Sequence, residues 1–172
     1  FRLTPDAAKP GLKNSNTKSS PGFFSADENT FLLAWTTTPW TLPSNFALAV
    51  NPNLKYVKVA KNDENFIVAE KLADKIFGEN NFKIVETISG KNLIGKKYTP
   101  LFPYFSDRDD LFEVIAEDFV SDTDGTGIVH LAPYGEDDFN AAKKRNLEIT
   151  SLETVDDSGN FKKIVADFAG EF

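Results

Sequence analysis

This sequence of 172 residues contains no cysteine, no methionine and a single histidine. Without cysteine the chain can form neither a disulfide framework nor a thiolate nucleophile. Zinc sites usually take about three or four nitrogen or sulfur ligands, so one histidine without cysteine argues strongly against a zinc site built by this chain. We therefore expect no metal and no cofactor.

Long apolar runs are also missing. No stretch approaches the roughly 18 to 20 residues that a membrane-spanning helix needs, and no signal peptide is visible. The net charge of −7 disfavours a surface that grips long stretches of nucleic-acid phosphate, although it leaves contact with a short end open. We expect no membrane partner.

The composition is otherwise that of a globular protein with a real core, since 41% of the residues are hydrophobic and 26% are charged. Translation begins at methionine, so a chain that lacks it and begins at Phe1 is expected to be a piece of a longer protein. Residues 1–22, rich in Pro, Lys, Asn and Ser, are predicted to form a flexible lead-in, and residues 23–172 a single domain.

Short apolar runs between turn residues predict a β-rich chain. Strands are predicted over residues 31–37, 46–50, 55–61, 66–68, 82–88 and 111–120, with 128–132 as the antiparallel partner of the last. Helices are predicted over residues 70–77 and 136–145. Many short strands, few helices and no internal repeat indicate an α+β, mainly β fold, which we expect to be a distorted β-barrel with peripheral α-helices.

The most unusual stretch is residues 34–45, which read AWTTTPWTLPSN. Alternation along a strand would place Thr36 and Thr38 on one face and Thr37 on the other. Pro39 restricts the residue before it to an extended conformation and removes the next backbone donor. Several hydroxyls beside two indoles could recognise a small polar ligand that carries an apolar side chain. A well-packed strand leading into a proline-rich loop explains the same residues equally well.

A second distinctive stretch, residues 125–139, reads GTGIVHLAPYGEDDF. Its glycines fit an ordinary turn, and its acidic residues fit the N-terminus of a helix. Strand alternation would put Ile128, His130 and Ala132 on one face, toward a pocket. A lone histidine in an apolar strand is more often a core residue than a catalytic one. The chain also lacks a glycine-rich phosphate loop and a Gly-x-Ser-x-Gly elbow, so its residue chemistry alone indicates at most a polar pocket.

Taken together, the two stretches resemble the editing domain inserted in class I aminoacyl-tRNA synthetases of the isoleucine, valine and leucine group. They are most similar to the isoleucyl type, because valyl and leucyl relatives usually carry Arg at the position of Thr38 and commonly a residue other than His at 130. The resemblance covers roughly residues 31–146 and is looser outside them.

The resemblance implies hydrolysis of valine wrongly attached to tRNA(Ile), in the cytoplasm. One methylene lets a synthetic site distinguish isoleucine from valine by only about 1–3 kcal/mol, a figure for which this class of synthetase is itself a standard example. The implied partners are the 3′ acceptor end of tRNA(Ile) carrying valine and the rest of the parent synthetase. The alternatives are an editing domain of a valyl- or leucyl-type synthetase and a non-catalytic module that binds the tRNA acceptor end.

The resemblance also implies roles for particular side chains. The catalytic residues are expected to be Thr37, Thr38 and Asp138. Substrate contacts are expected from Thr36, Trp40, Thr41, Asn45, His130 and Asp137. In this group His130 would exclude isoleucine and an aspartate would hold the substrate's α-ammonium group. The loop before the acidic pair is one residue shorter than in typical relatives, so Asp138 and Asp137 both remain candidates. A water placed by threonine hydroxyls and the substrate's ribose is expected in place of a strong general base.

Overall fold

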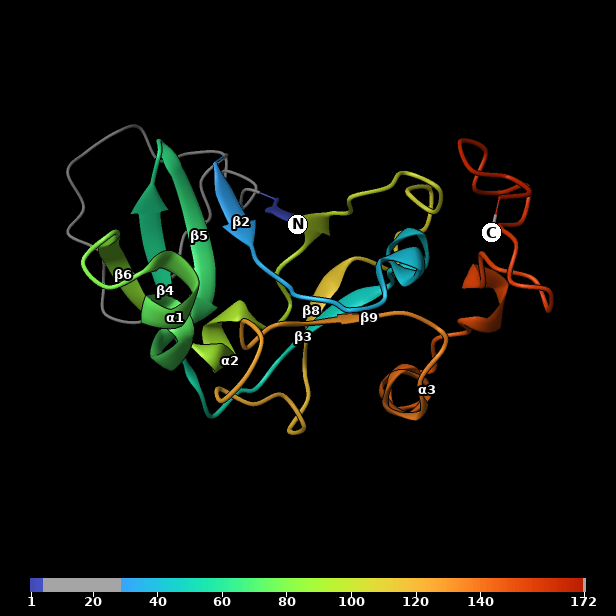
Figure 1. The fold of residues 1–172 in the computed structure, drawn as a ribbon. Helices are drawn as coiled ribbons and strands as arrows, with labels where there is room; N and C mark the ends of the chain where they lie inside the picture. The colour runs from blue at the N-terminus through green and yellow to red at the C-terminus, as the bar shows by residue number, and fades with distance from the viewer. Residues whose placement is uncertain (5–28, 172) are drawn as a thin grey trace, which may run out of the picture.

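The computed structural model describes residues 1–4 and 29–171, whose strands fall into two sheets (Figure 1). The larger sheet contains, in spatial order, β6 (Lys83–Ser89), β4 (Lys55–Lys61), β5 (Glu64–Ala69), β2 (Thr30–Leu32), β1 (Arg2–Leu3) and β7 (Tyr98–Thr99). The smaller sheet contains β8 (Glu113–Ala116), β3 (Ala47–Val50) and β9 (Val129–Leu131). Both strand orders are open at their two ends, so the closed-barrel detail of the predicted fold is not confirmed, while mixed sheets with few helices are observed.

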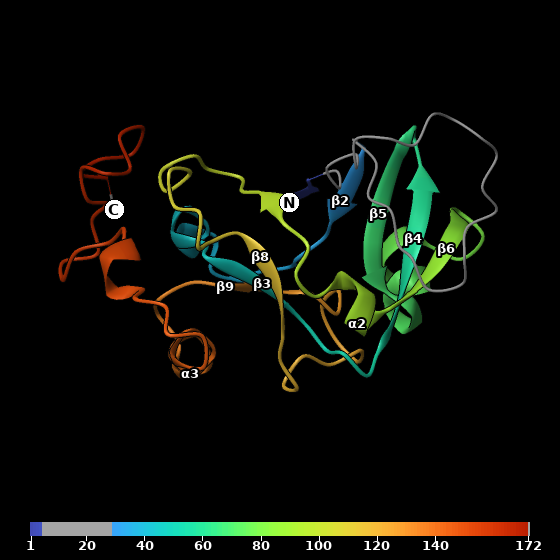
Figure 2. The same ribbon diagram turned by 180° about the vertical axis from the view of Figure 1, so that it is seen from behind.

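The helices are short and lie around the sheets. They are α1 (Ala73–Phe77), α2 (Gly90–Leu93) and α3 (Glu136–Lys143), with 3-10 turns η1 (Pro39–Ser44), η2 (Glu70–Leu72) and η3 (Thr150–Leu152). Figures 1 and 2 show α1 beside β4, β5 and β6 at one end of the molecule, and α3 with the C-terminal segment at the other. None of the helices in the described part of the chain is long and apolar enough to cross a membrane.

The β4–β5 hairpin shows how local sequence builds the larger sheet. Its two turn residues, Asn62 and Asp63, have φ angles of 52° and 64°, in the left-handed region that Asn and Asp tolerate better than most residues. The strands pair antiparallel in register from Tyr56 with Ala69 to Lys61 with Glu64. The strand predicted over residues 55–61 is therefore confirmed at both ends.

A buried contact joins the larger sheet to the segment that leads into β9. The hydroxyl of Tyr56 donates to the carbonyl oxygen of Gly127 at 2.8 Å, and the Ala69 N–H donates to the Thr126 carbonyl at 2.9 Å. Gly127 has a φ of +75°, and an added Cβ would lie 2.3 Å from the Cβ of Ala69. Only glycine fits this junction without displacing its neighbours. The close approach fixes where β9 begins.

The smaller sheet differs from the hairpin predicted over residues 111–120 and 128–132. The strand β3 lies between the two, parallel to β8 and antiparallel to β9, so β8 and β9 do not pair. All four residues of β3 are buried, which is typical of a central strand. A tight hairpin was expected from closeness in sequence, but burial of the apolar run 47–50 determines the order.

Other boundaries also shift. The strand predicted over 31–37 ends at Leu32, so the threonines lie in an irregular segment after it. The helix predicted over 70–77 is divided into η2 and α1. Most of the predicted lead-in lies outside the described residues. Its first residues are not loose, because Arg2–Leu3 form β1 and the side chains of Phe1 and Leu3 are buried.

Candidate functional site

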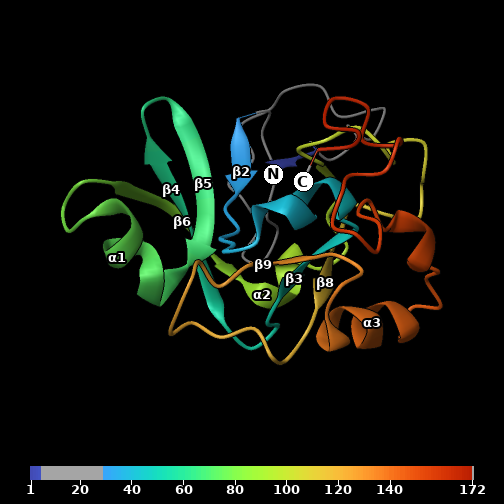
Figure 3. The ribbon, with the colours of Figure 1, turned by 45° about the vertical axis from the view of Figure 1, so that its right-hand side comes forward.

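A cleft of about 460 Å³ opens where the segment after β2 faces the end of β9 and the start of α3. One side, which we call the threonine side, consists of Trp35, Thr36, Thr37 and Thr38. The other, the histidine side, consists of Val129, His130, Ala132, Tyr134, Gly135 and Asp138. The η1 turn adds Trp40 and Thr41, and Figure 3 shows this turn next to β9. The two stretches singled out in the sequence thus form one cleft.

The threonine side is a polar, solvent-facing surface. The hydroxyl oxygens of Thr36 and Thr38 lie 3.3 Å apart, and the Thr38 N–H donates to the Thr36 hydroxyl at 3.0 Å. Such a side-chain to backbone bond closes a local turn at residues 36–38, which is incompatible with an extended strand there. Thr37 is exposed, and its hydroxyl has no partner among the described residues. Thr36 and Thr38 lie on the same side, as predicted, but Thr37 also lines the cleft, so its predicted separation onto another face is wrong.

The histidine side is held by a series of hydrogen bonds in which each group donates to the next. The Asn45 amide nitrogen lies 3.0 Å from Nδ1 of His130, and the Thr41 hydroxyl lies 2.9 Å from Nε2. Thr41 gives its only hydroxyl proton to the Thr38 carbonyl at 2.8 Å. An amide nitrogen can only donate, so Nδ1 accepts, and Nε2 must donate to Thr41. Both ends of the ring therefore require the Nε2–H tautomer.

His130 is unsuited to acid–base work in this arrangement. Burial lowers its pKa from the usual 6.5 to about 4, so the ring is neutral at pH 7. Its only unprotonated nitrogen accepts from Asn45, on the side away from the cleft, and is not available to a water molecule. The ring instead presents a fixed apolar and N–H edge to the cleft.

Asp138 is the acidic residue that reaches the cleft. Its Oδ1 accepts the Ala132 N–H at 2.8 Å, which ties the start of α3 to the end of β9. A Cβ added to Gly135 would lie 2.3 Å from Oδ2 of Asp138, so glycine leaves room for the carboxylate. Burial raises the pKa of Asp138, and backbone N–H groups oppose that shift only in part.

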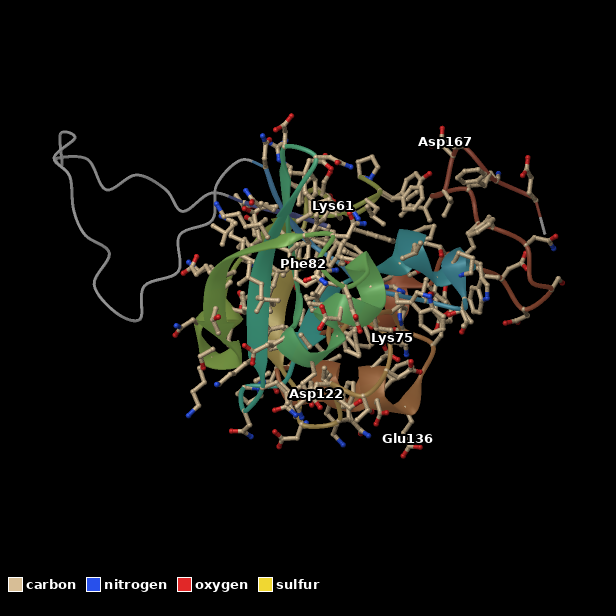
Figure 4. All side chains as sticks on the ribbon, turned by 60° about the vertical axis from the view of Figure 1, so that its left-hand side comes forward. Lys61, Lys75, Phe82, Asp122, Glu136 and Asp167 are labelled. Atoms are coloured by element: carbon tan, nitrogen blue, oxygen red, sulfur yellow. The ribbon has the colours of Figure 1, made fainter. Side chains whose placement is uncertain are left out.

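The neighbouring acidic residues face elsewhere. Asp137 is exposed and does not line the cleft; it borders a separate groove with Lys143 and Lys144. Glu136 projects outward from the first turn of α3 (Figure 4). Of the two candidate acidic residues, only Asp138 lines the cleft, and the role of binding the ammonium group stays a prediction. Within the described part of the chain, no group of three or more His, Cys, Asp or Glu residues could hold a metal ion.

Aromatic rings border the cleft near η1. The rings of Trp40 and Tyr134 meet edge to face with centroids 4.9 Å apart. Tyr134 is held by its hydroxyl, which lies 3.1 Å from the Ser44 hydroxyl and accepts the Thr154 N–H at 2.9 Å. Trp35 is 61% exposed. Sequence reasoning missed Tyr134, although its position inside the second motif was a signal that could have found it.

Two predicted positions need correction. Asn45, expected to contact substrate, is 2% exposed and does not line the cleft; it lies behind His130. Its amide nitrogen also donates to the Ala47 and Leu131 carbonyls at 2.9 and 3.3 Å. Ile128, expected to face the pocket, is buried in the core at 2% exposure, and Val129 lines the cleft instead. Val129 and His130 are consecutive in β9 and both line the cleft, so strict alternation does not hold in this three-residue strand.

No protein-family profile matches this chain. Among curated proteins it is similar to isoleucine–tRNA ligases. A probable cytoplasmic isoleucine–tRNA ligase of Dictyostelium discoideum is 46% identical over 156 residues, covering 84% of this chain and 15% of that protein. The enzyme of Clostridium tetani is 46% identical over 145 residues, covering 84% and 14%. The chain thus spans about one-seventh of the length of these relatives.

Among solved structures the chain is similar to leucyl-type synthetase editing domains. It matches the crystal structure of GlLeuRS-CP1 with a TM-score of 0.57 and 28% identity, covering 67% of this chain and 43% of that one. It matches the editing domain of the P. knowlesi cytosolic leucyl-tRNA synthetase with a TM-score of 0.55 and 17% identity, covering 75% and 56%. These likenesses confirm the resemblance on which the site residues were predicted.

Proposed function

Because this chain resembles the editing domain of isoleucyl-tRNA synthetases in sequence and the leucyl-type editing domains in fold, we propose that it hydrolyses mischarged aminoacyl-tRNA. The substrate is valyl-tRNA(Ile), presented by the rest of the parent synthetase in the cytoplasm. Much higher identity to isoleucine–tRNA ligases than to the leucyl-type structures favours this substrate over those of the neighbouring types.

One observation carries the proposal. A single cleft holds free and paired threonine hydroxyls, a fixed neutral imidazole and a carboxylate, the groups that an aminoacyl ester requires. Its volume of about 460 Å³ falls within the roughly 300–1,000 Å³ typical of small-ligand sites. The terminal adenosine with its amino acid is a ligand of this size class.

The threonine side provides the polar groups nearest the ester. The hydroxyl of Thr37 is free to orient a water molecule, and the paired Thr36 and Thr38 hydroxyls present oxygen lone pairs beside it. His130 cannot serve as the base, and no other neutral base lines the cleft among the described residues. Hydrolysis then depends on placing a water against the ester carbonyl, helped by the substrate's ribose hydroxyl.

Asp138 and His130 select the amino acid. The carboxylate of Asp138 attracts the α-ammonium group, and this pairing favours the ionised form against the raised pKa of the acid. The imidazole of His130 is bonded at both nitrogens, so it cannot turn aside easily for a longer side chain. Overfilling a packed site by one methylene typically costs about 1–3 kcal/mol. Valine is therefore accepted and isoleucine is hindered.

The test is to measure release of free amino acid from valyl-tRNA(Ile) and from isoleucyl-tRNA(Ile), with this chain and with the parent synthetase. We expect the valyl ester to be hydrolysed about tenfold faster or more. Background rates for both esters, with retained binding of the acceptor end, would establish a non-catalytic module. Preferential hydrolysis of a mischarged valine or leucine tRNA would assign the domain to a neighbouring type.

A further inference from the structure

Tyr98 is a buried polar residue next to the cleft that belongs to neither motif. It lies on β7, at the edge of the larger sheet, and is 3% exposed. Its hydroxyl donates to Oδ1 of Asn45 at 2.6 Å. It does not line the cleft, so any effect it has there must pass through Asn45.

The Asn45 carboxamide is hydrogen-bonded at both of its ends. Its oxygen accepts from Tyr98, and its nitrogen donates to two backbone carbonyls and to Nδ1 of His130. The tyrosine hydroxyl and the two carbonyls thus determine which end of the amide faces the imidazole. The sequence of donors runs from Tyr98 to Asn45, from Asn45 to His130, and from His130 through Thr41 to the Thr38 carbonyl.

We propose that Tyr98 is a positioning residue for His130. Acting through Asn45, its hydroxyl holds the imidazole in the Nε2–H tautomer and in the orientation that faces the cleft. The consequence for selectivity rests on the proposed editing function. The consequence for the tautomer does not, because it concerns only the chain itself.

Burial and packing make Tyr98 a dependable donor. Burial raises its pKa well above 10, so the hydroxyl keeps its proton. Its ring contacts Phe1 and Phe112 edge to face, with centroids 5.4 and 6.0 Å apart. The Phe1 ring also stacks on His130, with centroids 6.4 Å apart and planes 16° from parallel. One aromatic side chain therefore contacts both ends of the Tyr98–Asn45–His130 series.

Removing the Tyr98 hydroxyl leaves the Asn45 oxygen buried without a donor, which is costly. Of the groups bonded to this amide, the two carbonyls can only accept, and only the imidazole can change from acceptor to donor. An Nδ1–H tautomer would satisfy the oxygen once the amide turns, but turning also breaks the amide's bonds to the Ala47 and Leu131 carbonyls, so the Nδ1–H species becomes more populated without replacing the Nε2–H species. The Nδ1–H tautomer would also draw the Thr41 hydroxyl from the Thr38 carbonyl to Nε2, so the change would reach the threonine side of the cleft.

The test uses Tyr98→Phe in the 172-residue chain and nitrogen-15 NMR of the imidazole at pH 7. His130 is the only histidine, so all imidazole signals come from one ring, and nitrogen couplings to its two carbon-bound protons distinguish Nδ1 from Nε2. Protonated and unprotonated ring nitrogens resonate in separate regions of the spectrum. We expect the Nε2–H species to dominate in the parent sequence, with the Nδ1–H species as a minor population. In Tyr98→Phe the population of the Nδ1–H species should rise about tenfold or more.

Tyr56→Phe is the matched control. Tyr56 is also fully buried and donates its hydroxyl to a backbone carbonyl, but it bonds no residue of the cleft. Both variants should lower the thermal midpoint, and only Tyr98→Phe should change the imidazole spectrum. Identical spectra for the two variants would overturn the proposal and reduce Tyr98 to a stabilising residue. A dominant Nδ1–H species in the parent sequence would overturn it as well.

A kinetic measurement then separates this inference from the proposed function. In the parent synthetase, Tyr98→Phe should narrow the ratio of valyl to isoleucyl ester hydrolysis several-fold, while Tyr56→Phe leaves it unchanged. If Tyr98→Phe changes the tautomer but no variant hydrolyses either ester, the proposed editing function is wrong and the positioning role of Tyr98 stands. If Tyr98→Phe leaves both the tautomer and the selectivity for the valyl ester unchanged, the editing function stands and the positioning role is wrong.

Discussion

The two sides of the cleft are built in opposite ways. On the threonine side, the hydroxyls of Thr36 and Thr38 bond each other near solvent, and Thr37 is exposed. On the histidine side, His130 is bonded at both nitrogens and backed by the buried Asn45. The first side can adjust to a ligand, and the second cannot.

This difference suggests a division of labour. A surface that loses little stability when altered is suited to contacts made only with the substrate or with water. A surface embedded in the core is suited to measuring the size of a side chain, because its position is set before the ligand arrives. Changes on the threonine side should therefore affect rate, whereas changes at His130 should affect selectivity and stability.

The largest effect is expected from Thr37→Ala combined with Thr38→Ala. Loss of the groups that orient water should lower single-turnover hydrolysis of valyl-tRNA(Ile) by about a hundredfold or more. Because both side chains are exposed, the free energy of unfolding should change by no more than about 0.5 kcal/mol. Thr123→Ala, an exposed threonine outside the cleft, is the control. A large loss of stability with an unchanged hydrolysis rate would show that the threonine side is structural and does not act on substrate or water.

Asp138→Asn should have the next largest effect. The amide keeps an oxygen to accept the Ala132 N–H but loses the charge that attracts the α-ammonium group. Charge-assisted bonds contribute about 1.5–3 kcal/mol, so the rate should fall roughly ten- to a hundredfold. Asp137→Asn is the matched control and should change the rate little, since Asp137 lies outside the cleft. A reversed ranking in deacylation assays would move the ammonium site by one residue.

Acid should destabilise the histidine side. In the unfolded chain His130 titrates near pH 6.5, and in the folded chain near 4, so the unfolded state binds more protons between these values. Stability should therefore fall as the pH drops, by about 2 kcal/mol from pH 7 to pH 5. Denaturant unfolding at several pH values measures this.

His130→Asn provides the control for that pH dependence. Asp138 acts in the opposite direction, since its raised pKa makes the folded state gain protons as the pH falls. The difference between the original chain and the variant isolates the histidine contribution. Equal slopes in the two proteins between pH 7 and pH 5 would show that His130 is not held neutral.

The smallest effect is expected in the selectivity of His130→Ala. Removing the imidazole vacates volume beside the cleft, so isoleucyl-tRNA(Ile) should be hydrolysed about tenfold faster. The valyl ester should remain a substrate. Loss of activity on both esters would assign His130 to catalysis. A loss of stability with an unchanged ratio of rates would make it a core residue only. Both deacylation rates, measured with a thermal melt, distinguish these outcomes.

The sequence was most informative where local pattern decides structure. The strand over residues 55–61 follows from its Tyr and Val residues and from the turn signal Asn51-Pro52-Asn53 before it, and both of its ends agree with the structure. The pairing of β9 with β3 could not be predicted in this way, because a central strand is defined by burial on both sides. Local patterns also do not predict that Thr38 and His130 share one cleft, and that expectation came only from the family resemblance.

Single side chains were predicted less well for a geometric reason. Successive residues of a helix point about 100° apart, so the start of α3 at Glu136 decides that Asp138 faces the cleft and Asp137 does not. Asn45 follows the η1 turn, whose path carries its amide inward, behind His130. Tyr98 carries no local signal, because its importance depends only on its partner across the fold.

The pairing of β9 with β3 also bears on the order in which the protein becomes competent. Thr41 and His130, which touch in the cleft, are 89 residues apart in the chain. During synthesis the threonine segment leaves the ribosome long before β9 exists, and contacts this distant in sequence form late and slowly. Until then, Asn45 and Thr41 lack their hydrogen-bond partner, the imidazole of His130. The selective cleft should thus be among the last parts to mature, and chains interrupted before residue 129 should carry the threonines without any ability to discriminate.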